Sequence, residues 1–269
     1  MRVADLDRAL LFYQGKLGFR LRAQHEQTAY LSATGEEPDH LRLTERPGAK
    51  PKPRRTTGLF HAAIRLPSRK ALADVLLRLL RQHVEPQGFS DHGVSEAIYL
   101  SDPDGNGLEL YADRPRSEWA HRAGQVVMVT EPLDMNGLLA HVTDEAGATG
   151  LDPKTDIGHV HLQVADLAKT EEFYHGQLGF EVTQRSYPGA LFFAAAGYHH
   201  HIGANIWAGR SLPRPPEDAA GLMAFSVVAP NVGDRASHRV VEDPDGNRIE
   251  LITDSRPEAG PNREIANTD

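Results

Sequence analysis

The chain of 269 residues contains no cysteine, which excludes disulfides, thiolate metal sites and cysteine nucleophiles. No apolar run approaches the roughly 18 residues that a membrane span requires. The N-terminal segment lacks the charged and apolar regions of a signal peptide. No run of basic residues occurs, and the net charge of -8 argues against nucleic-acid binding. Together these absences predict a cytoplasmic protein that binds neither nucleic acid nor membrane.

Histidine, by contrast, is abundant, with 14 residues. With no cysteine in the chain, imidazole and carboxylate are the available ligands for a transition metal. A content of 40% hydrophobic and 25% charged residues is typical of a globular protein. The length permits one large domain or two modest ones.

A long internal repeat selects two domains. Val-Ala-Asp-Leu at 3–6 returns at 164–167, Phe-Tyr at 12–13 returns at 173–174, and Leu-Gly-Phe at 17–19 returns at 178–180. All three are offset by 161 residues, whereas Asp-Pro-Asp-Gly-Asn at 102–106 returns at 243–247, offset by only 141. The period is too long for a solenoid, so it indicates duplicated domains with residues lost from the second copy.

Each half divides into two modules. In module 1 (1–50), helical spacing over 5–16 precedes strands at 29–32 and 40–44. In module 2 (57–113), a strand at 59–66 precedes a helix capped by Ser68, then strands at 97–100 and 107–111 joined as a hairpin. Modules 3 (157–210) and 4 (221–254) repeat them. The predicted domains are therefore 1–113 and 157–254, with a connector at 114–156 and a polar, disordered tail at 255–269.

The repeated order strand-helix-strand-strand-strand resembles the vicinal oxygen chelate superfamily, which includes glyoxalase I, bleomycin resistance proteins and extradiol dioxygenases. The resemblance covers nearly the whole chain and is closest to catechol-2,3-dioxygenase-like proteins. The motifs that carry it are Gly-His-Val-His-Leu-Gln-Val-Ala-Asp-Leu at 158–167, Asp-Pro-Asp-Gly-Asn-Gly-Leu-Glu at 102–109, Gly-Tyr-His-His-His-Ile at 197–202, and the segments 91–100 and 113–119. It implies an α+β fold of tandem βαβββ modules, four in all, that form curved mixed sheets around a central cleft.

In that superfamily the first strand of a module can carry a histidine ligand and the last strand a glutamate. By this resemblance His159, His61 and Glu109 are the candidate metal ligands. Two imidazoles and one carboxylate form a facial triad that suits Fe(II), or Mn(II) or another divalent metal, and leaves positions open for substrate and O₂. His161 shares a strand face with His159 and is its main rival.

The counterparts of these histidines in modules 1 and 4 are absent or replaced. The counterpart of His159 would precede Met1, so module 1 is predicted to lack its first strand, through a misassigned start codon or a decaying gene. The counterpart of His61 is Ala224, and module 4 is too short for its helix. Pairing module 1 with 2 and 3 with 4 completes no triad, whereas pairing module 2 with 3 assembles all three ligands. We favour the second pairing, with the eroded modules 1 and 4 as a structural pair.

Three further residues are predicted to act at this site. Tyr99 precedes Glu109 by ten positions, as the active-site tyrosine does in extradiol dioxygenases. His201 aligns with the family's acid/base histidine, and strand alternation would turn His200 away from it. His92 is predicted to contact the substrate. Trp119 and Trp207 are interpreted as packing residues.

The predicted function is a metal-dependent extradiol-type dioxygenase that cleaves a catecholic or related aromatic ring with O₂, in a protein that could form a homodimer. A glyoxalase-like isomerase or lyase is an alternative, although such sites usually use a second glutamate, which the end of module 3 does not supply. A non-catalytic module that sequesters a drug or small aromatic molecule is the alternative from another class, and the eroded modules favour it.

Overall fold

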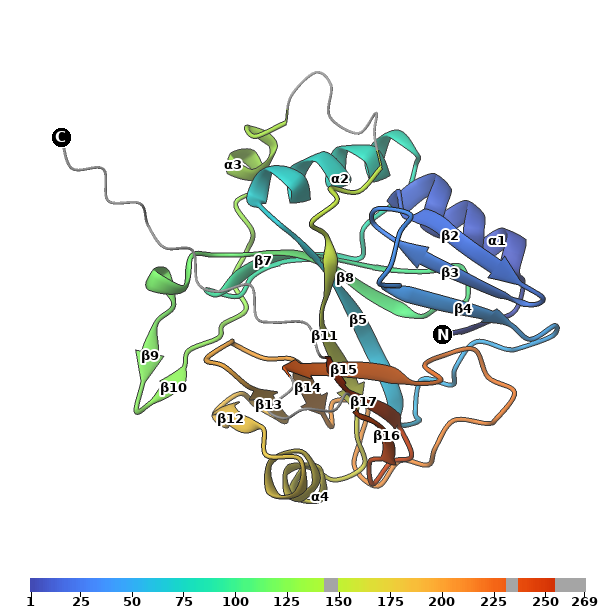
Figure 1. Ribbon diagram of the computed structural model, residues 1–269. Coiled ribbons are helices and arrows are strands. Elements are labelled where there is room, and N and C mark those ends of the chain that lie inside the picture. Colours follow the sequence, from blue (N-terminus) through green and yellow to red (C-terminus); the bar gives the residue numbers. More distant parts are fainter. Residues whose placement is uncertain (143–149, 231–236, 255–269) are drawn as a thin grey trace.

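The computed structural model describes residues 1–142, 150–230 and 237–254, and within this part of the chain most regular structure is β-strand (Figure 1). The strands form sheets of eight, four, three and two strands. This architecture confirms the predicted α+β fold. The predicted tail at 255–269 lies outside the described residues.

Modules 2 and 3 together build the eight-stranded sheet, in the order β12-β13-β14-β11-β5-β8-β7-β6. Module 2 contributes β5 (Gly58–Leu66), α2 (Arg69–Arg81), β6 (Gly88–Asp91), β7 (Ser95–Ser101) and β8 (Gly107–Asp113). Module 3 contributes β11 (Asp156–Gln163), α4 (Leu167–Glu171) with its continuation η3 (Glu172–Gln177), β12 (Glu181–Gln184), β13 (Ala190–Ala194) and β14 (Ile202–Asn205). The two modules join where β5 and β11 pair antiparallel, so their first strands lie side by side (Figure 1).

Module 1 forms the four-stranded sheet and module 4 forms the three-stranded sheet. Module 1 contains β1 (Arg2–Val3), α1 (Leu6–Leu10), the π-helical η1 (Leu11–Leu17), β2 (Arg20–His25), β3 (Thr28–Ser32) and β4 (Leu41–Glu45). Module 4 contains β15 (Phe225–Pro230), β16 (Ser237–Glu242) and β17 (Arg248–Asp254). The prediction that module 1 lacks its first strand is wrong, because β1 pairs parallel with β4 as a two-residue strand. Arg2 also bridges antiparallel to Gly221, which brings modules 1 and 4 into contact.

The same hydrogen bond ties the modules together in each half. Tyr13, fully buried in module 1, donates its hydroxyl to Asp102 in the hairpin turn of module 2, at 3.0 Å. Tyr174 donates in the same way to Asp243, also at 3.0 Å. Asp102 accepts from the backbone of the turn as well. The repeated Asp-Pro-Asp-Gly-Asn turns are therefore hairpin turns that also anchor a neighbouring helix, rather than calcium loops.

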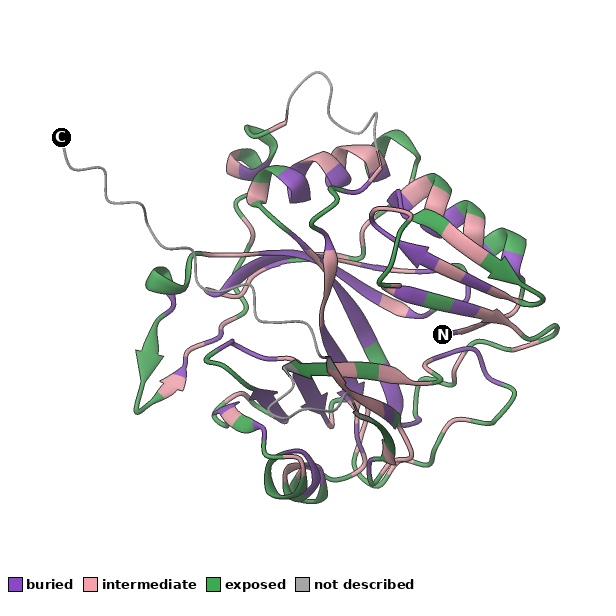
Figure 2. Ribbon diagram, in the orientation of Figure 1, coloured by how far each residue is buried: buried purple, intermediate pink, exposed green. Residues whose placement is uncertain are grey.

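The centre of the large sheet is buried, as the strands around the junction of β5 and β11 show (Figure 2). Helix α2 covers one face, and the predicted cap is present because the Ser68 side chain accepts from the Ala71 amide at 3.1 Å. The connector holds η2 (Arg116–Glu118), β9 (His121–Arg122), β10 (Gln125–Val126) and α3 (Met135–Leu139). The division into domains 1–113 and 157–254 stays a prediction. The eight-stranded sheet contains strands from both sides of the connector.

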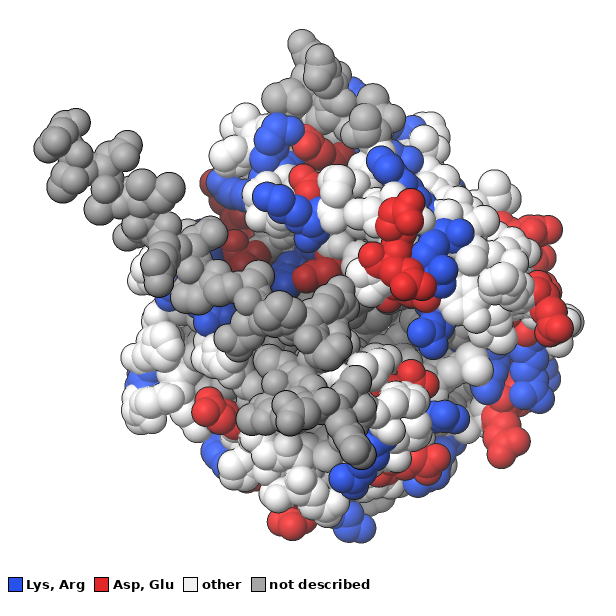
Figure 3. Space-filling view, in the orientation of Figure 1, with Lys and Arg blue, Asp and Glu red and all other residues white. Residues whose placement is uncertain are grey.

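Acidic and basic side chains are interspersed on the face of the molecule in Figure 3. Within the described ranges, no helix has both the length and the apolar character needed to cross a bilayer.

Candidate functional site

His61 on β5, Glu109 on β8 and His159 on β11 meet at the junction of modules 2 and 3. One oxygen of Glu109, Oε2, lies 2.8 Å from His61 Nε2 and 3.2 Å from His159 Nε2. The two Nε2 atoms are 3.4 Å apart. All three side chains are buried. Ligand atoms from residues 48 to 98 positions apart in the chain are thus brought within one small triangle.

Strand pairing explains why these residues meet. Glu109 lies opposite Ala63 on the parallel strand β5, two residues from His61 and on the same face. Across the antiparallel junction, His161 lies opposite His61, and the register shifts between Ile157 and His159. From His159 to His161 the pairing is regular, with His159 opposite Ala63, so His159 is the diagonal neighbour of His61 on one face of the sheet. The geometry results from module 2 packing on module 3, not from either module alone.

The charge state of the triangle suits a cation. Burial would raise the pKa of Glu109, but the imidazoles of His159 and His61 hold it well below its usual range. Burial lowers the pKa of His159 to about 4 despite the facing carboxylate. At neutral pH the site therefore holds an ionised carboxylate and a neutral imidazole at His159, which are the forms that bind metals.

The donor atoms also have the spacing of a facial triad. Three neighbouring octahedral positions about 2.1 Å from a metal lie about 3 Å apart, and the measured separations are 2.8, 3.2 and 3.4 Å. Among the described residues, buried His159 Nδ1 has no hydrogen-bond partner, and the polar contacts of that ring are made by Nε2 inside the triangle. These residues fit a divalent metal bound by two nitrogens and one oxygen.

Tyr99 and His92 lie beside the triangle as a hydrogen-bonded pair. Tyr99 is the cross-strand neighbour of Glu109, and its hydroxyl is 2.6 Å from His92 Nε2. A carbonyl only accepts, so His92 Nδ1 donates to the Val129 carbonyl at 2.6 Å, and in this tautomer His92 Nε2 accepts the hydrogen bond from the Tyr99 hydroxyl. Burial, with Glu109 adding to it, raises the pKa of Tyr99 well above 10, so Tyr99 stays a phenol. Both predicted residues are therefore brought to the site.

His201 is not brought to the site, and His200 takes the place predicted for it. The ring of His200 lies 4.0 Å from that of His159 and lines the adjacent cavity. His201 instead lies against Tyr198, and its Nδ1 accepts from the Ala195 amide. Strand alternation fails here because β14 begins only at Ile202, so residues 197–201 form an irregular turn.

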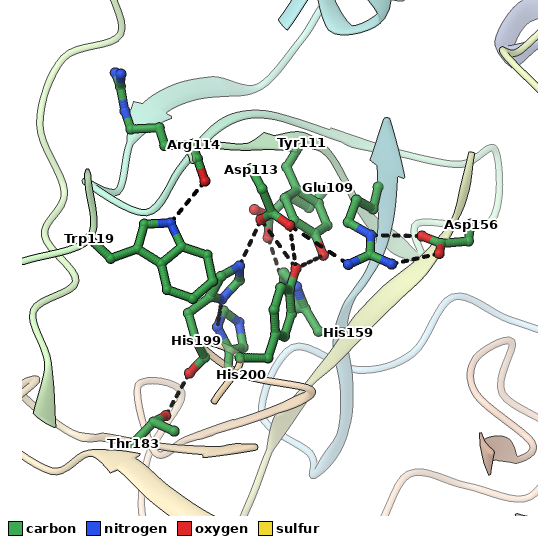
Figure 4. Close-up of polar contacts among 12 residues, drawn as sticks. Glu109, Tyr111, Asp113, Arg114, Trp119, Asp156, His159, Thr183, His199 and His200 are labelled. Carbon is green, nitrogen blue, oxygen red and sulfur yellow. Dashed lines mark hydrogen bonds and ion pairs between the residues drawn. The ribbon is translucent and has the colours of Figure 1, made fainter. Parts of the chain in front are cut away.

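A hydrogen-bonded chain that the sequence analysis missed leads to His200 (Figure 4). His199 Nε2 lies 2.9 Å from Asp113, and His199 Nδ1 lies 2.7 Å from His200 Nδ1. Tyr198 and Arg65 also contact Asp113. Asp113 is the first residue of segment 113–119, one of the motifs on which the family resemblance rests. Its place in that motif was the feature of the sequence that could have indicated a role in the site.

The triangle borders a cavity of about 570 Å³. It is lined by His61, Glu109, Tyr99, His92, His161 and His200 near the triangle, and by aromatic residues that include Phe60, Phe89, Tyr187, Phe192 and Trp207. Trp207 was predicted to be a packing residue, yet it is 46% exposed and lines the cavity, whereas Trp119 is buried as predicted. The cavity can therefore admit a small molecule to His61 and Glu109, the two candidate ligands that line it.

The His161 ring has room in the site because residue 203 is a glycine. The two residues are paired on β11 and β14, as Ala63 and Glu109 are on β5 and β8. A Cβ atom at position 203 would lie 2.9 Å from the His161 ring. A second glutamate at this equivalent position would therefore displace His161, and the described residues form one triangle with a single carboxylate.

The free energy of unfolding of the metal-free protein is expected to fall as the pH is lowered from about 6.5 to about 4. Burial holds the pKa values of folded His159 and His201 at about 4, whereas histidines in the unfolded chain titrate near 6.5. The unfolded chain therefore binds more protons in this window, and the stability present above 6.5 is lost toward 4.

Urea unfolding in the presence of a chelator, at steps between those pH values, measures this dependence. His201→Gln should flatten it, while the same change at exposed His83 should not. Stability that stays level or rises with acid would contradict the prediction.

Comparisons with known proteins place the chain in a family. The model of the Glyoxalase/Bleomycin resistance protein/Dioxygenase superfamily matches residues 1–110 and 156–234. A catechol-2,3-dioxygenase of Bacillus subtilis (strain 168) is 48% identical over 235 residues, covering 86% of this chain and 81% of that protein. A biphenyl-2,3-diol 1,2-dioxygenase 3 of Rhodococcus globerulus is 34% identical over 104 residues, covering 38% of this chain and 54% of that protein.

The fold has relatives among solved structures as well. Glyoxalase I from Zea mays superposes with a TM-score of 0.52 at 16% identity, covering 94% of this chain and 89% of that chain. The family match spans well over half of the chain, and the Bacillus subtilis relative spans most of it. The chain belongs to the Glyoxalase/Bleomycin resistance protein/Dioxygenase superfamily.

Proposed function

We propose that this protein is a metal-dependent extradiol-type dioxygenase that cleaves a catecholic ring with O₂. The observation that carries the proposal is the buried triangle of His61, His159 and Glu109, which borders a cavity walled by aromatic side chains. The two relatives, a catechol-2,3-dioxygenase and a biphenyl-2,3-diol 1,2-dioxygenase, support it. A cytoplasmic location and a homodimer stay predictions.

His61, His159 and Glu109 would hold the metal, and Fe(II) suits this ligand set best, with Mn(II) as the alternative. When bound, the metal would supply a centre at which two ring oxygens and O₂ are held together and electron density passes between them. The cavity side of the triangle would remain open to the substrate. The aromatic walls would hold the ring and exclude bulk water.

Tyr99 and His92 would handle the proton of a substrate hydroxyl. Tyr99 is a phenol whose hydroxyl proton is shared with His92 Nε2 at 2.6 Å. A substrate oxygen beside Tyr99 could accept this hydrogen bond in place of His92. The Tyr99 and His92 pair would thus orient one ring oxygen and keep a proton within reach of it.

His200 would serve as the acid/base group in the cavity, positioned by His199 and Asp113. A carboxylate only accepts, so His199 donates to Asp113 from Nε2 and accepts at Nδ1. His200 must then donate from its own Nδ1. This leaves His200 Nε2 unprotonated and able to take a proton from a ligand. Asp113 and His199 are positioning residues in this scheme, because they act through His200.

Anaerobic loading with Fe(II), followed by catechol and O₂, tests the function. We expect a yellow ring-opened product, with one O₂ consumed for each catechol. Loaded protein that binds catechol but consumes no O₂ would refute the dioxygenase and favour the sequestering module. The glyoxalase-like alternative loses support, since Gly203 stands where a second carboxylate would be needed.

A further inference from the structure

Two proline-rich basic loops lie side by side between the modules. Residues 46–56 contain five basic residues and residues 209–216 contain two, and neither segment holds an acidic residue. The Thr57 amide donates to the Pro213 carbonyl at 3.0 Å, and the Ala220 amide donates to the Lys50 carbonyl at 2.7 Å. Backbone hydrogen bonds therefore hold the two loops together and gather positive charge in a chain whose net charge is -8.

A second cavity, of about 140 Å³, lies where these loops meet modules 2 and 4. It is lined by the start of β5, by residues 220–223 and by the hairpin turn of module 4. Three basic side chains also line it, from segments far apart in the sequence: Lys52, Arg214 and Arg248. This cavity shares no lining residue with the cavity that borders the triangle, so it is a separate site.

Lys52 is half-buried without an acidic partner. Its Nζ donates to Gln163 Oε1 at 2.8 Å and to the Thr56 carbonyl at 3.5 Å, and both acceptors are neutral. Burial lowers the pKa of Lys52, because the ammonium loses hydration there. An ammonium has three N–H donors, so one donor of Lys52 remains for a further acceptor.

The Arg214 guanidinium lies on the hairpin turn of module 4. It donates to the Pro244 carbonyl at 3.3 Å. It also occupies the space that a Cβ atom at Gly246 would need. Glycine at this position of the turn therefore lets the guanidinium lie against the backbone at the edge of the cavity.

Positive charge exceeds negative charge around the cavity. Asp245 is the one acid of its lining, and this carboxylate accepts from the Ala165 amide at 3.2 and 3.3 Å. Arg248 is exposed, and no ion pair joins it to a described acid. Three basic side chains against one acid leave an excess that a phosphate group can offset, since such a group carries about -1.5 to -2 charges near pH 7.

We propose that this cavity binds a phosphate group, held by Lys52, Arg214 and Arg248. Guanidinium and ammonium groups are the usual protein partners of phosphate oxygens. An apolar cavity of roughly 150 Å³ accepts a benzene-sized molecule, so about 140 Å³ has room for one phosphate group. The bound anion would relieve the repulsion among the three bases and connect both loops to module 4. The site does not depend on the proposed dioxygenase function.

Calorimetric titration of the purified protein with inorganic phosphate tests the site, with potassium chloride keeping the ionic strength constant. We expect one phosphate to bind per chain with a Kd of about 1 mM or lower. No saturable heat up to about 10 mM phosphate would overturn the proposal. Because phosphate could also bind the metal, His61→Ala is titrated in parallel. It should bind phosphate as the wild type does, and loss of binding in this variant would place the anion at the triangle instead.

Three variants and one control locate the anion. Lys52→Met and Arg214→Gln should each weaken phosphate binding about 10- to 100-fold, the usual effect of losing a hydrogen bond to a charged group. Arg248→Glu should abolish it. Arg239→Gln removes the charge of an exposed arginine on β16 outside the cavity and should leave the affinity unchanged. Equal weakening in Arg214→Gln and Arg239→Gln would reduce the effect to general charge and overturn the site.

Methyl phosphate and acetate identify the kind of anion. Methyl phosphate that binds as tightly as inorganic phosphate would support the phosphate end of a larger molecule as the ligand. Binding more than about 10-fold weaker would support inorganic phosphate itself. Acetate that binds as tightly as phosphate would overturn the proposal, because the cavity would then not distinguish a phosphate group from a carboxylate.

Discussion

His61→Ala is expected to remove the bound metal almost completely. The substitution leaves one imidazole and one carboxylate, Glu109, whose Oε2 lies 2.8 Å from the lost Nε2. Loss of even an outer partner of a metal site costs about 10- to 100-fold in affinity, and loss of a ligand should cost more than about 100-fold. Metal analysis of anaerobically purified protein should show about one equivalent in the wild type and under about a tenth in the variant.

Two further substitutions make the result specific. Ala224→His restores a histidine at the equivalent position of module 4, and the metal content should not change because that position is not part of the triangle. His161→Ala removes the rival ligand and should also leave the metal in place. Metal lost in His161→Ala but retained in His159→Ala would reverse the assignment. A wild type that takes up no metal after reconstitution would refute the metal site.

The repeat in the sequence favoured the pairing of module 2 with module 3. Because module 4 has Ala224 where module 2 has His61, only the pairing of modules 2 and 3 brings together two histidines and a glutamate. The eight-stranded sheet contains this pair of modules. The prediction depended only on ligand positions at the start of β5 and β11 and within β8.

The position of His200 could not be predicted in the same way. Side-chain alternation holds only within a strand, and the turn at 197–201 ends before β14 begins. Trp207 and Asp113 were missed for a related reason. The role of Trp207 depends on Pro188, Gly189 and Phe60, which reach it through folding. The roles of these residues depend on contacts between segments distant in the sequence. The helices and strands, by contrast, could be predicted from local sequence patterns.

His200→Phe is expected to lower kcat by about 10²- to 10⁴-fold while the metal is retained. A phenyl ring can keep the packing against the His159 ring, whose centroid lies 4.0 Å away in the wild type, but it has no nitrogen to exchange a proton. Loss of a positioned acid/base group costs about this much. Since the triangle is intact, metal content should match the wild type. A kcat within about threefold of the wild type would exclude His200 from the chemistry.

Asp113→Asn tests the chain behind His200 with a smaller structural change. The amide can donate to His199 Nε2, which would move the His199 proton to Nδ1 and force the His200 proton to Nε2. His200 would then face the substrate in the wrong tautomer. We expect kcat to fall about 10- to 100-fold with KM and metal content nearly unchanged, because neither the triangle nor the mouth of the cavity is altered.

Asp156→Asn is the matched control for Asp113→Asn. Asp156 shares Arg65 with Asp113, and its carboxylate accepts from Arg65 at 2.6 and 2.9 Å, but it has no contact with His199. A loss of kcat in both variants would point to the shared Arg65 and to general loosening of β5. A loss confined to Asp113→Asn would trace the effect through His199 to the tautomer of His200.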